Sequence, residues 1–221
     1  MKLTNRLGKV ASLVNKGATL VDIGCDHGFL SIFLLENQII NKAYACDINQ
    51  GPLNNVKENV KKHGLNDKIE CILSDGLKEL TNIEFDTVVI AGMGGSLIVD
   101  ILEEAKKIIV NKQIIVQPNI NSYGLRKWLI ENNFKIDNEI LVDDNNIIYE
   151  IIEANQGCNV KYNDFELSYG KINLSNESSL LINKMNDDLN KYQRIIKQLP
   201  KDSDKYIEFN KKILEIEEYL K

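Results

Sequence analysis

The sequence predicts an α/β protein: a parallel sheet covered by helices, followed by a helical region without strands. Short apolar segments alternate with amphipathic segments between residues 19 and 132, a pattern typical of parallel strands whose connecting helices cover both faces of the sheet. After residue 157, apolar residues recur only at helical spacing. We therefore expect a first domain over residues 1–158 and a helical domain over residues 159–221.

The first domain is expected to begin with a helix and to end with a β-hairpin. The helix is indicated by apolar residues at helical spacing: Leu3, Leu7, Val10 and Val14. Strands are expected at 19–23, 43–47, 68–73, 86–90 and 113–117, with helices near 28–37, 52–63, 96–109 and 122–132. Only turn-forming residues, 143–146, separate segments 134–142 and 147–153, which predicts an antiparallel hairpin at the sheet edge.

The C-terminal domain is expected to be a coiled-coil hairpin of two helices. One apolar stripe consists of Leu181, Met185, Leu189, Tyr192, Ile196 and Leu199. A break over residues 200–204 supplies a proline and N-cap residues. A second stripe repeats at the three- and four-residue spacing of a coiled-coil seam: Tyr206, Phe209, Ile213, Ile216 and Leu220. The alternative is that both stripes pack on the first domain.

Composition limits the class of protein. Of 221 residues, 43% are hydrophobic and 27% charged, and no apolar run reaches the roughly 18 residues that span a bilayer. The N-terminus lacks a signal-peptide core, so we expect a cytoplasmic protein without a membrane segment. Four cysteines without Cys-x-x-Cys spacing and two histidines predict no metal site. The net charge of −5 argues weakly against nucleic acid, but it does not exclude a local basic patch.

The most informative segment is Asp22-Ile23-Gly24-Cys25-Asp26-His27-Gly28, which follows the first strand and opens a helix. Its glycines let a ligand approach bare backbone. It is not the Gly-x-Gly-x-x-Gly of a dinucleotide site, nor a P-loop, because no Gly-Lys-Ser/Thr follows. Its Asp-x-Gly-x-x-x-Gly form resembles the first motif of class I S-adenosyl-L-methionine (SAM) methyltransferases. The resemblance implies a Rossmann-like fold with SAM as cofactor.

Four further strand ends carry candidate site residues. Asp47 is placed to accept hydrogen bonds from ribose hydroxyls, and Asp75 to bond an adenine amino group beside Gly76, or alternatively to cap a helix. The turn Ala91-Gly92-Met93-Gly94-Gly95 permits a strained backbone against a ligand. It lacks the Asp/Asn-Pro-Pro-aromatic motif of amino-group methyltransferases, which argues for a different nucleophile. Gln117-Pro118-Asn119 adds polar groups at the same edge or, alternatively, an ordinary loop.

Together these segments resemble the bacterial tRNA adenine-N1-methyltransferases that act on adenine 22. The residues that carry the resemblance are the first glycine motif with its Asp-His-Gly ending, the 91–95 turn, Gln117-Pro118-Asn119 and Ile148-Tyr149-Glu150. The resemblance implies a tRNA substrate and these cofactor contacts: Asp22, Gly24, Cys25, Gly28, Asp47, Ile48, Asp75, Gly76, Ala91, Gly92 and Met93. The expected substrate contacts are Gly94, Gly95, Gln117, Pro118, Asn119 and Arg126.

Asp26 and His27 are the expected catalytic residues. Adenine N1 is neutral and has an in-plane lone pair, so positioning matters more than a strong base. Asp26 would offset the positive charge that moves onto the adenine, and His27 would bond the base or a phosphate; alternatively, both only cap the next helix. The target adenine must also be flipped out of the folded tRNA, which costs a few kcal/mol of free energy. Phosphate contacts that would offset this cost are expected from the C-terminal domain and from Lys57, Lys61, Lys62, Arg126 and Lys127.

Two other classes of protein remain open from the sequence. A nicotinamide dehydrogenase would use a similar fold, although the missing Gly-x-Gly-x-x-Gly argues against it. A noncatalytic protein that binds partners through the helical hairpin is the second. Among methyltransferases, a small-molecule or protein substrate is a further alternative.

Overall fold

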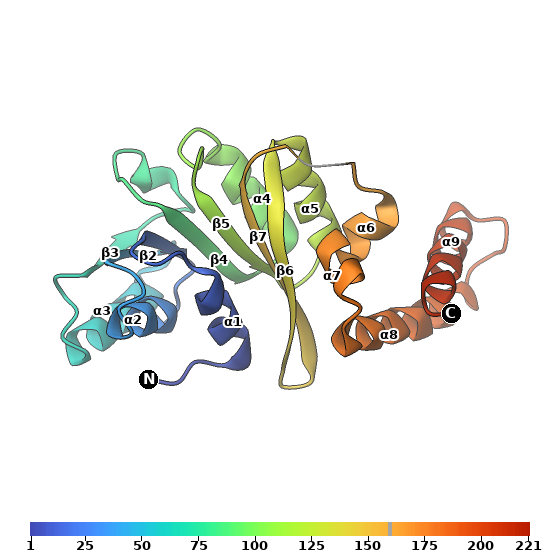
Figure 1. Ribbon diagram of the computed structural model, residues 1–221, viewed down its shortest axis with the longest axis horizontal. Coiled ribbons are helices and arrows are strands. Elements are labelled where there is room, and N and C mark those ends of the chain that lie inside the picture. Colours follow the sequence, from blue (N-terminus) through green and yellow to red (C-terminus); the bar gives the residue numbers. More distant parts are fainter. Residues whose placement is uncertain (159–160) are drawn as a thin grey trace. The chain divides into compact units, whose positions relative to one another are not determined.

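The computed structural model describes residues 1–158 and 161–221. The chain divides into two compact units, residues 1–160 and 161–221. The first is an α/β unit, and the second consists of helices in its described part (Figure 1). None of the described helices combines the length and the apolar character needed to cross a membrane.

A seven-stranded sheet in the order β3-β2-β1-β4-β5-β7-β6 organises the first unit. The parallel strands are β1 (Thr19–Ile23), β2 (Lys42–Asp47), β3 (Ile69–Leu73), β4 (Thr87–Met93) and β5 (Gln113–Pro118). The antiparallel hairpin of β6 (Phe134–Asp144) and β7 (Ile147–Gln156) completes the sheet, with β7 beside β5. The predicted parallel sheet with an edge hairpin is confirmed.

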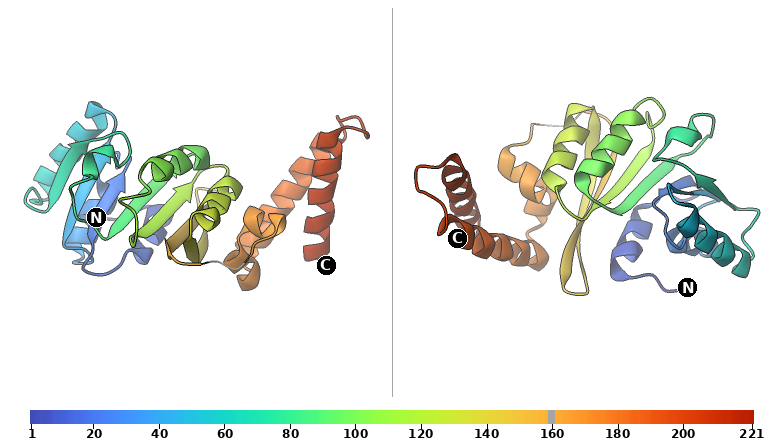
Figure 2. Two further views of the ribbon diagram at one scale, coloured as in Figure 1. Left: turned by 90° about the horizontal axis from the view of Figure 1, so that it is seen from above. Right: turned by 180° about the vertical axis from the view of Figure 1, so that it is seen from behind.

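Helices cover both faces of this sheet (Figure 1 and Figure 2). On one face lie α1 (Asn5–Leu13), α2 (Phe29–Glu36) and α3 (Gln50–Lys62), and on the other α4 (Gly95–Glu104) and α5 (Ser122–Glu131). A short 3-10 helix, η1 (Lys78–Leu80), follows β3. The core between the layers is apolar, with Leu20, Ile32 and Val56 fully buried, so tertiary packing fixes these helices.

Several elements end at positions different from those expected: the hairpin strands β6 and β7 are two and three residues longer than expected, and the ends of α4 and β4 also differ. Helix α4 ends at Glu104 rather than 109, because the Ala105 carbonyl accepts the Ile108 and Ile109 amides in a turn. Strand β4 continues to Met93 instead of ending at residue 90. Its pairing with β5 shifts register between Ala91 and Met93, and Gly92 adopts a φ of +81°. The glycine-rich segment is therefore the bulged end of a strand rather than a free loop.

The second unit contains α6 (Asp164–Tyr169), α7 (Lys171–Asn176), α8 (Ser179–Ile196) and α9 (Asp204–Tyr219). Helices α8 and α9 correspond to the two expected helices and contact each other; the Tyr192 and Phe209 rings lie 5.3 Å apart. Their apolar stripes bury Leu181, Met185, Ile213 and Ile216. Coiled-coil geometry stays a prediction. The two short helices α6 and α7 were not expected.

Candidate active site

The sheet order brings the predicted cofactor segments to one edge. Strands β3, β2, β1 and β4 are neighbours, so their carboxyl ends lie side by side, where open α/β sheets bind ligands. The Gly24 amide donates to the Cys46 carbonyl at 2.8 Å, and the Ser74 amide donates to the Asp47 carbonyl at 3.0 Å. These bonds join the turns after β1, β2 and β3 into one surface.

The turn after β1 has a backbone that side chains would disrupt. Gly24 and Gly28 adopt φ values of +70° and +69°, a region that favours glycine. A Cβ at Gly24 would lie 2.3 Å from Met93 Cε, and one at Gly28 would lie 2.8 Å from Val56 Cγ1. Met93 therefore packs on the backbone of Gly24 and connects the two glycine-rich segments. Cys25, which follows Gly24, is buried, and burial raises the pKa of its thiol, so it is a neutral packing group.

Asp22 lies beneath this turn, buried at 5% exposure, and accepts a hydrogen bond from Ser31 Oγ at 2.9 Å. Burial raises the pKa of Asp22 from 3.8 to about 6, against the opposing effect of the Ser31 hydrogen bond. The folded protein therefore binds a proton on Asp22 more tightly than the unfolded chain does. Its position supports the turn from below rather than from the exposed side.

The raised pKa of Asp22 predicts a pH-dependent stability. Below pH 3.8 the carboxyl is neutral in both the folded and the unfolded chain. The stability that the protonated carboxyl gives the folded state is lost as the pH rises through about 6. The free energy of unfolding of Asp22→Asn, relative to that of the wild-type chain, should therefore rise by at most about 3 kcal/mol between pH 3.5 and pH 7. Urea unfolding followed by the fluorescence of Trp128, the single tryptophan, measures this difference. A difference that stays constant with pH would contradict the assignment.

Asp47 and Asp75 lie at the ends of β2 and β3. Asp47 is half-buried, and its Oδ1 accepts the Asn49 amide at 2.8 Å, while the next residue, Ile48, is 62% exposed. Asp75 is exposed and pairs with Lys78. It does not cap η1, whose N-cap is Leu77 without a side-chain bond; Ser74 Oγ accepts the Glu79 amide instead. The capping alternative for Asp75 is therefore wrong.

Asp47→Ala should weaken SAM binding about tenfold to a hundredfold, because a charge-assisted hydrogen bond contributes on the order of 1.5–3 kcal/mol. Asp67→Ala removes an exposed carboxylate at the other end of β3 and is the matched control. Calorimetric titration with SAM measures both variants. If Asp47→Ala binds SAM with wild-type affinity, the ribose assignment fails.

Asp26 and His27 lie on the exposed side of the turn after β1. Their side chains are 74% and 44% exposed, with His27 Nε2 3.6 Å from Asp26 Oδ1. The His27 ring stacks on Phe29 at 5.1 Å, and its carbonyl accepts a bond from Asn59 Nδ2 at 3.0 Å. The N-cap of α2 is Gly28, without a side-chain bond. The alternative that Asp26 and His27 cap α2 is therefore wrong, and both side chains face solvent at the site.

Gly94 and Gly95 connect the bulged end of β4 to α4. Gly94 is the N-cap of that helix. Gly95 is buried, and its amide donates to the Ile120 carbonyl at 2.9 Å. A Cβ there would lie 2.4 Å from the Asn121 carbonyl oxygen. Gly95 thus serves the close packing of two turns, and its expected substrate contact is not supported by its position.

Arg126 is not a substrate contact, contrary to the expectation. It is fully buried in α5. Its Nε bonds Glu139 Oε1 at 2.6 Å, and its Nη2 bonds Glu150, which also accepts from Ser122 Oγ. Two carboxylates from β6 and β7 hold this guanidinium inside the unit. Burial alone would lower the pKa of Arg126, but the charges of Glu150 and Glu139 outweigh it and raise this pKa. The neighbouring Lys127 is exposed. Of Arg126 and Lys127, only Lys127 is therefore in a position compatible with the expected phosphate contact.

Gln117 and Pro118 also have internal positions. Gln117 is fully buried; its Oε1 accepts from Arg6, and its Nε2 donates to the Pro118 carbonyl at 3.0 Å and to Asn119 Oδ1 at 3.2 Å. Asn119 is exposed, but its Nδ2 donates to the Gly92 carbonyl at 2.7 Å. The expected direct contact of Gln117 with substrate is corrected: this segment supports the end of β4.

Arg6 and Tyr149 have positions at this edge that the sequence did not predict. Arg6, in the first turn of α1, donates to Gln117 and lies over the Tyr149 ring at 5.4 Å from its centroid. It stands outside the apolar stripe of α1, and a charged residue there is usually solvated. Tyr149 entered only as part of the family resemblance. No local pattern places these two residues together.

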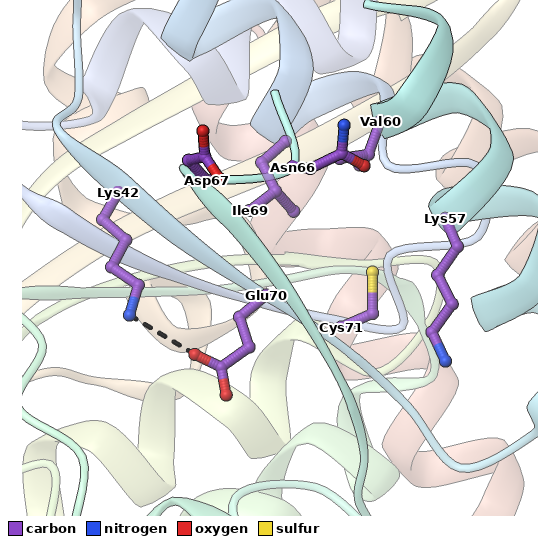
Figure 3. Close-up of a pocket in the computed structure, with 8 residues that line it drawn as sticks. All are labelled: Lys42, Lys57, Val60, Asn66, Asp67, Ile69, Glu70 and Cys71. Carbon is purple, nitrogen blue, oxygen red and sulfur yellow. Dashed lines mark hydrogen bonds and ion pairs between the residues drawn. The ribbon is translucent and has the colours of Figure 1, made fainter. Parts of the chain in front are cut away.

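A separate cavity of about 350 Å³ lies beside the edge strand β3 (Figure 3). It is lined by none of the expected cofactor or catalytic residues. Of the expected phosphate contacts it has Lys57, beside Cys71 and Lys42, whose Nζ lies 3.3 Å from Glu70 Oε2. Among residues 1–158 and 161–221, no cluster of three or more His, Cys, Asp or Glu side chains is arranged to hold a metal ion. The candidate site is therefore the set of strand ends, not this cavity.

The parallel sheet, its strand order and the glycine-lined edge define a class I SAM-dependent methyltransferase. A protein-family model described as tRNA (adenine(22)-N(1))-methyltransferase, TrmK, matches residues 20–218. The chain belongs to this family. The tRNA (adenine(22)-N(1))-methyltransferase of Bacillus subtilis strain 168 is 33% identical over 210 residues, 92% of this chain and 88% of that protein.

Among the solved structures that resemble the whole chain are two with a bound ligand. TrmK of M. capricolum in complex with S-adenosyl-homocysteine (SAH) has a TM-score of 0.91 and 33% identity, covering 100% of this chain and 98% of that one. Sp1610 of Streptococcus pneumoniae in complex with SAM has a TM-score of 0.92 and 32% identity, covering 100% of both chains. The expected family, Rossmann-like fold, enzyme class and SAM cofactor are confirmed. The individual site residues that the structure does not contradict stay predictions.

Proposed function

We propose that this chain methylates N1 of adenine 22 in tRNA in the cytoplasm, using the carboxyl edge of β1, β2, β3 and β4. The observation that carries the proposal is that the turn after β1 combines a backbone surface for the cofactor with exposed side chains for the reaction. Gly24 and Gly28 provide the bare backbone that a cofactor needs, while Asp26 and His27 between them expose their side chains. A binding surface and candidate catalytic groups are thus a few residues apart.

The residues present fit SAM. Gly24, Gly28 and Gly92 have positive φ values at this edge, Asp47 has a carboxylate for ribose hydroxyls, and Asp75 has one for the adenine amino group. When bound, SAM supplies a methyl group made electrophilic by its sulfonium. Lys78, which pairs with Asp75 and lies 3.1 Å from Glu104 Oε2, is exposed, and surface ion pairs of this kind contribute at most about 1 kcal/mol.

Asp26 and His27 would act on the target base rather than on the cofactor. Adenine N1 carries no proton at neutral pH, so its attack needs no base to remove one. The methylated adenine is positively charged, and a carboxylate at Asp26 stabilises that charge as it develops. His27, stacked on Phe29, is placed to bond the base edge or a phosphate. A base flipped out of a folded tRNA would meet this exposed side of the turn.

Asp26→Asn should lower turnover about tenfold to a hundredfold, since hydrogen bonds to charged groups contribute roughly 1.5–3 kcal/mol. Asparagine tolerates the φ of +48° at this position, so the turn should persist. Single-turnover methylation at saturating SAM and tRNA measures the effect, and Asp67→Asn is the matched control. Wild-type turnover in Asp26→Asn would reduce this residue to a turn-forming role.

The function itself is tested with unmodified tRNA transcripts that carry adenine or guanine at position 22. Labelled methyl groups should enter only the adenine transcript, and digestion should yield 1-methyladenosine. Equal incorporation into both transcripts would place the reaction at another nucleotide. No incorporation, despite SAM binding, would favour a small-molecule or protein substrate or a noncatalytic role.

The second unit is proposed to bind the tRNA. Its helix α8 and the following turn expose Lys191, Arg194, Lys197 and Lys201, side chains that can follow an RNA backbone with salt-sensitive affinity. Lys184, in contrast, is half-buried and lies 3.8 Å from Asp188. The four exposed cations are therefore the phosphate contacts we expect from α8 and the turn that follows it.

A further inference from the structure

Arg6 is a half-buried cation whose guanidinium has neutral partners. Its Nη1 donates to Gln117 Oε1, and its Cζ lies over the Tyr149 ring. Asp144 accepts a bond from the Arg6 backbone amide, not from the guanidinium. Within residues 1–158 and 161–221, no carboxylate lies within ion-pair distance of this guanidinium. A guanidinium in this setting keeps its charge without an internal counterion.

The position of this guanidinium is fixed relative to the active site. Gln117 is buried and bonded to Asn119, which in turn bonds the Gly92 carbonyl. A Cβ at Gly92 would lie 3.5 Å from Arg6 Nη1. The next residue, Met93, packs on Gly24 of the turn after β1. The chain of contacts therefore holds Arg6 beside the bulged end of β4, next to the predicted cofactor surface.

The remaining donors of Arg6 suit an oxyanion. A guanidinium has five N–H donors in a planar fork, and it binds carboxylates and phosphates through two parallel hydrogen bonds. The Gln117 bond uses one of these donors. A neutral amide and an aromatic face orient the fork without neutralising it, which leaves its charge for a ligand.

We propose that Arg6 binds an oxyanion of a ligand at the active site, either the carboxylate of the amino-acid part of SAM or a phosphate of the tRNA. The proposal rests on the proposed function, because both ligands belong to that reaction. The two oxyanions can be distinguished by measurement, since SAH carries the carboxylate, whereas only the nucleic acid carries the phosphate.

The test compares Arg6→Gln and Arg6→Lys with Lys9→Gln, which removes an exposed charge from the same helix. Calorimetry measures the affinity for SAH and for 5′-methylthioadenosine, which shares the nucleoside and the sulfur but lacks the carboxylate. If Arg6 binds the cofactor carboxylate, Arg6→Gln should lose at least tenfold in SAH affinity and less than twofold for methylthioadenosine. Arg6→Lys should lose less than Arg6→Gln.

If Arg6 binds a phosphate, SAH affinity stays unchanged, while tRNA affinity, measured by filter binding without turnover, falls several-fold with a shallower salt dependence. The proposal is overturned if neither affinity changes in Arg6→Gln, or if SAH and methylthioadenosine lose affinity equally, because Arg6 would then only support the fold. Both arms are binding measurements, so absent methylation by the wild-type chain would count against the proposed function and not against Arg6.

Discussion

Replacing Arg126 with methionine is expected to destabilise the first unit by about 3–5 kcal/mol, the usual cost of removing one partner of a buried ion pair. The change leaves Glu139 and Glu150, at 2% and 6% exposure, without their counterion. Two carboxylates would then share an apolar site and must be desolvated or protonated. Urea unfolding followed by Trp128 fluorescence measures the loss.

Two further variants separate this mechanism from a simple loss of packing. Lys127→Met removes the neighbouring cation, whose Nζ lies 3.9 Å from Glu131 Oε1 at the surface, and should cost less than about 1 kcal/mol. Adding Glu139→Leu and Glu150→Leu to Arg126→Met should restore most of the stability, since the unpaired carboxylates are gone. If the triple variant is as unstable as Arg126→Met alone, the cost comes from shape and not from charge.

The same cluster shows what the sequence could not predict. Arg126 lies between Leu125 and Lys127 on an amphipathic helix, where a charged residue is usually solvated. Its partners are 13 and 24 residues away, on strands whose inward positions otherwise bury apolar residues such as Ile136 and Ile151. Only the tertiary pairing of α5 with β6 and β7 shows that these glutamates face inward and need a cation.

The strands and the cofactor edge were predictable, because their signals are local. Each parallel strand is a short apolar run, and glycine or a carboxylate lies at or just after the carboxyl ends of β1, β2, β3 and β4. The bulged end of β4 was not predictable, since it depends on Asn119, which follows β5 and donates to the carbonyls of both Gly92 and Met93. Helices α6 and α7 were missed because six residues each span under two turns, too few for a periodicity to emerge.

Removing residues 161–221 is expected to abolish tRNA methylation while SAM binding persists. The first unit contains the whole sheet and every predicted cofactor residue. The second unit buries its own apolar residues, including Met185 and Ile216, between its own helices. Each unit thus has a core, and the truncated chain should fold; wild-type-like fluorescence of Trp128 and an unchanged calorimetric SAH affinity would verify this.

The full-length chain offers a sharper version of this test. Reversing the charges of Lys191, Arg194 and Lys197, which are exposed on or directly after α8, leaves the buried contacts of α8 with α9 in place. This variant should bind tRNA at least tenfold more weakly at moderate salt, with a shallower salt dependence, because fewer counterions are released. Its SAH affinity should equal that of the wild-type chain. Reversing Lys205, Lys211 and Lys212 on α9 changes the charge by the same amount and should have a smaller effect. If both triple variants bind tRNA equally well, α8 is not the surface that recognises the substrate. The same conclusion follows if the truncated protein folds and methylates tRNA at the normal rate.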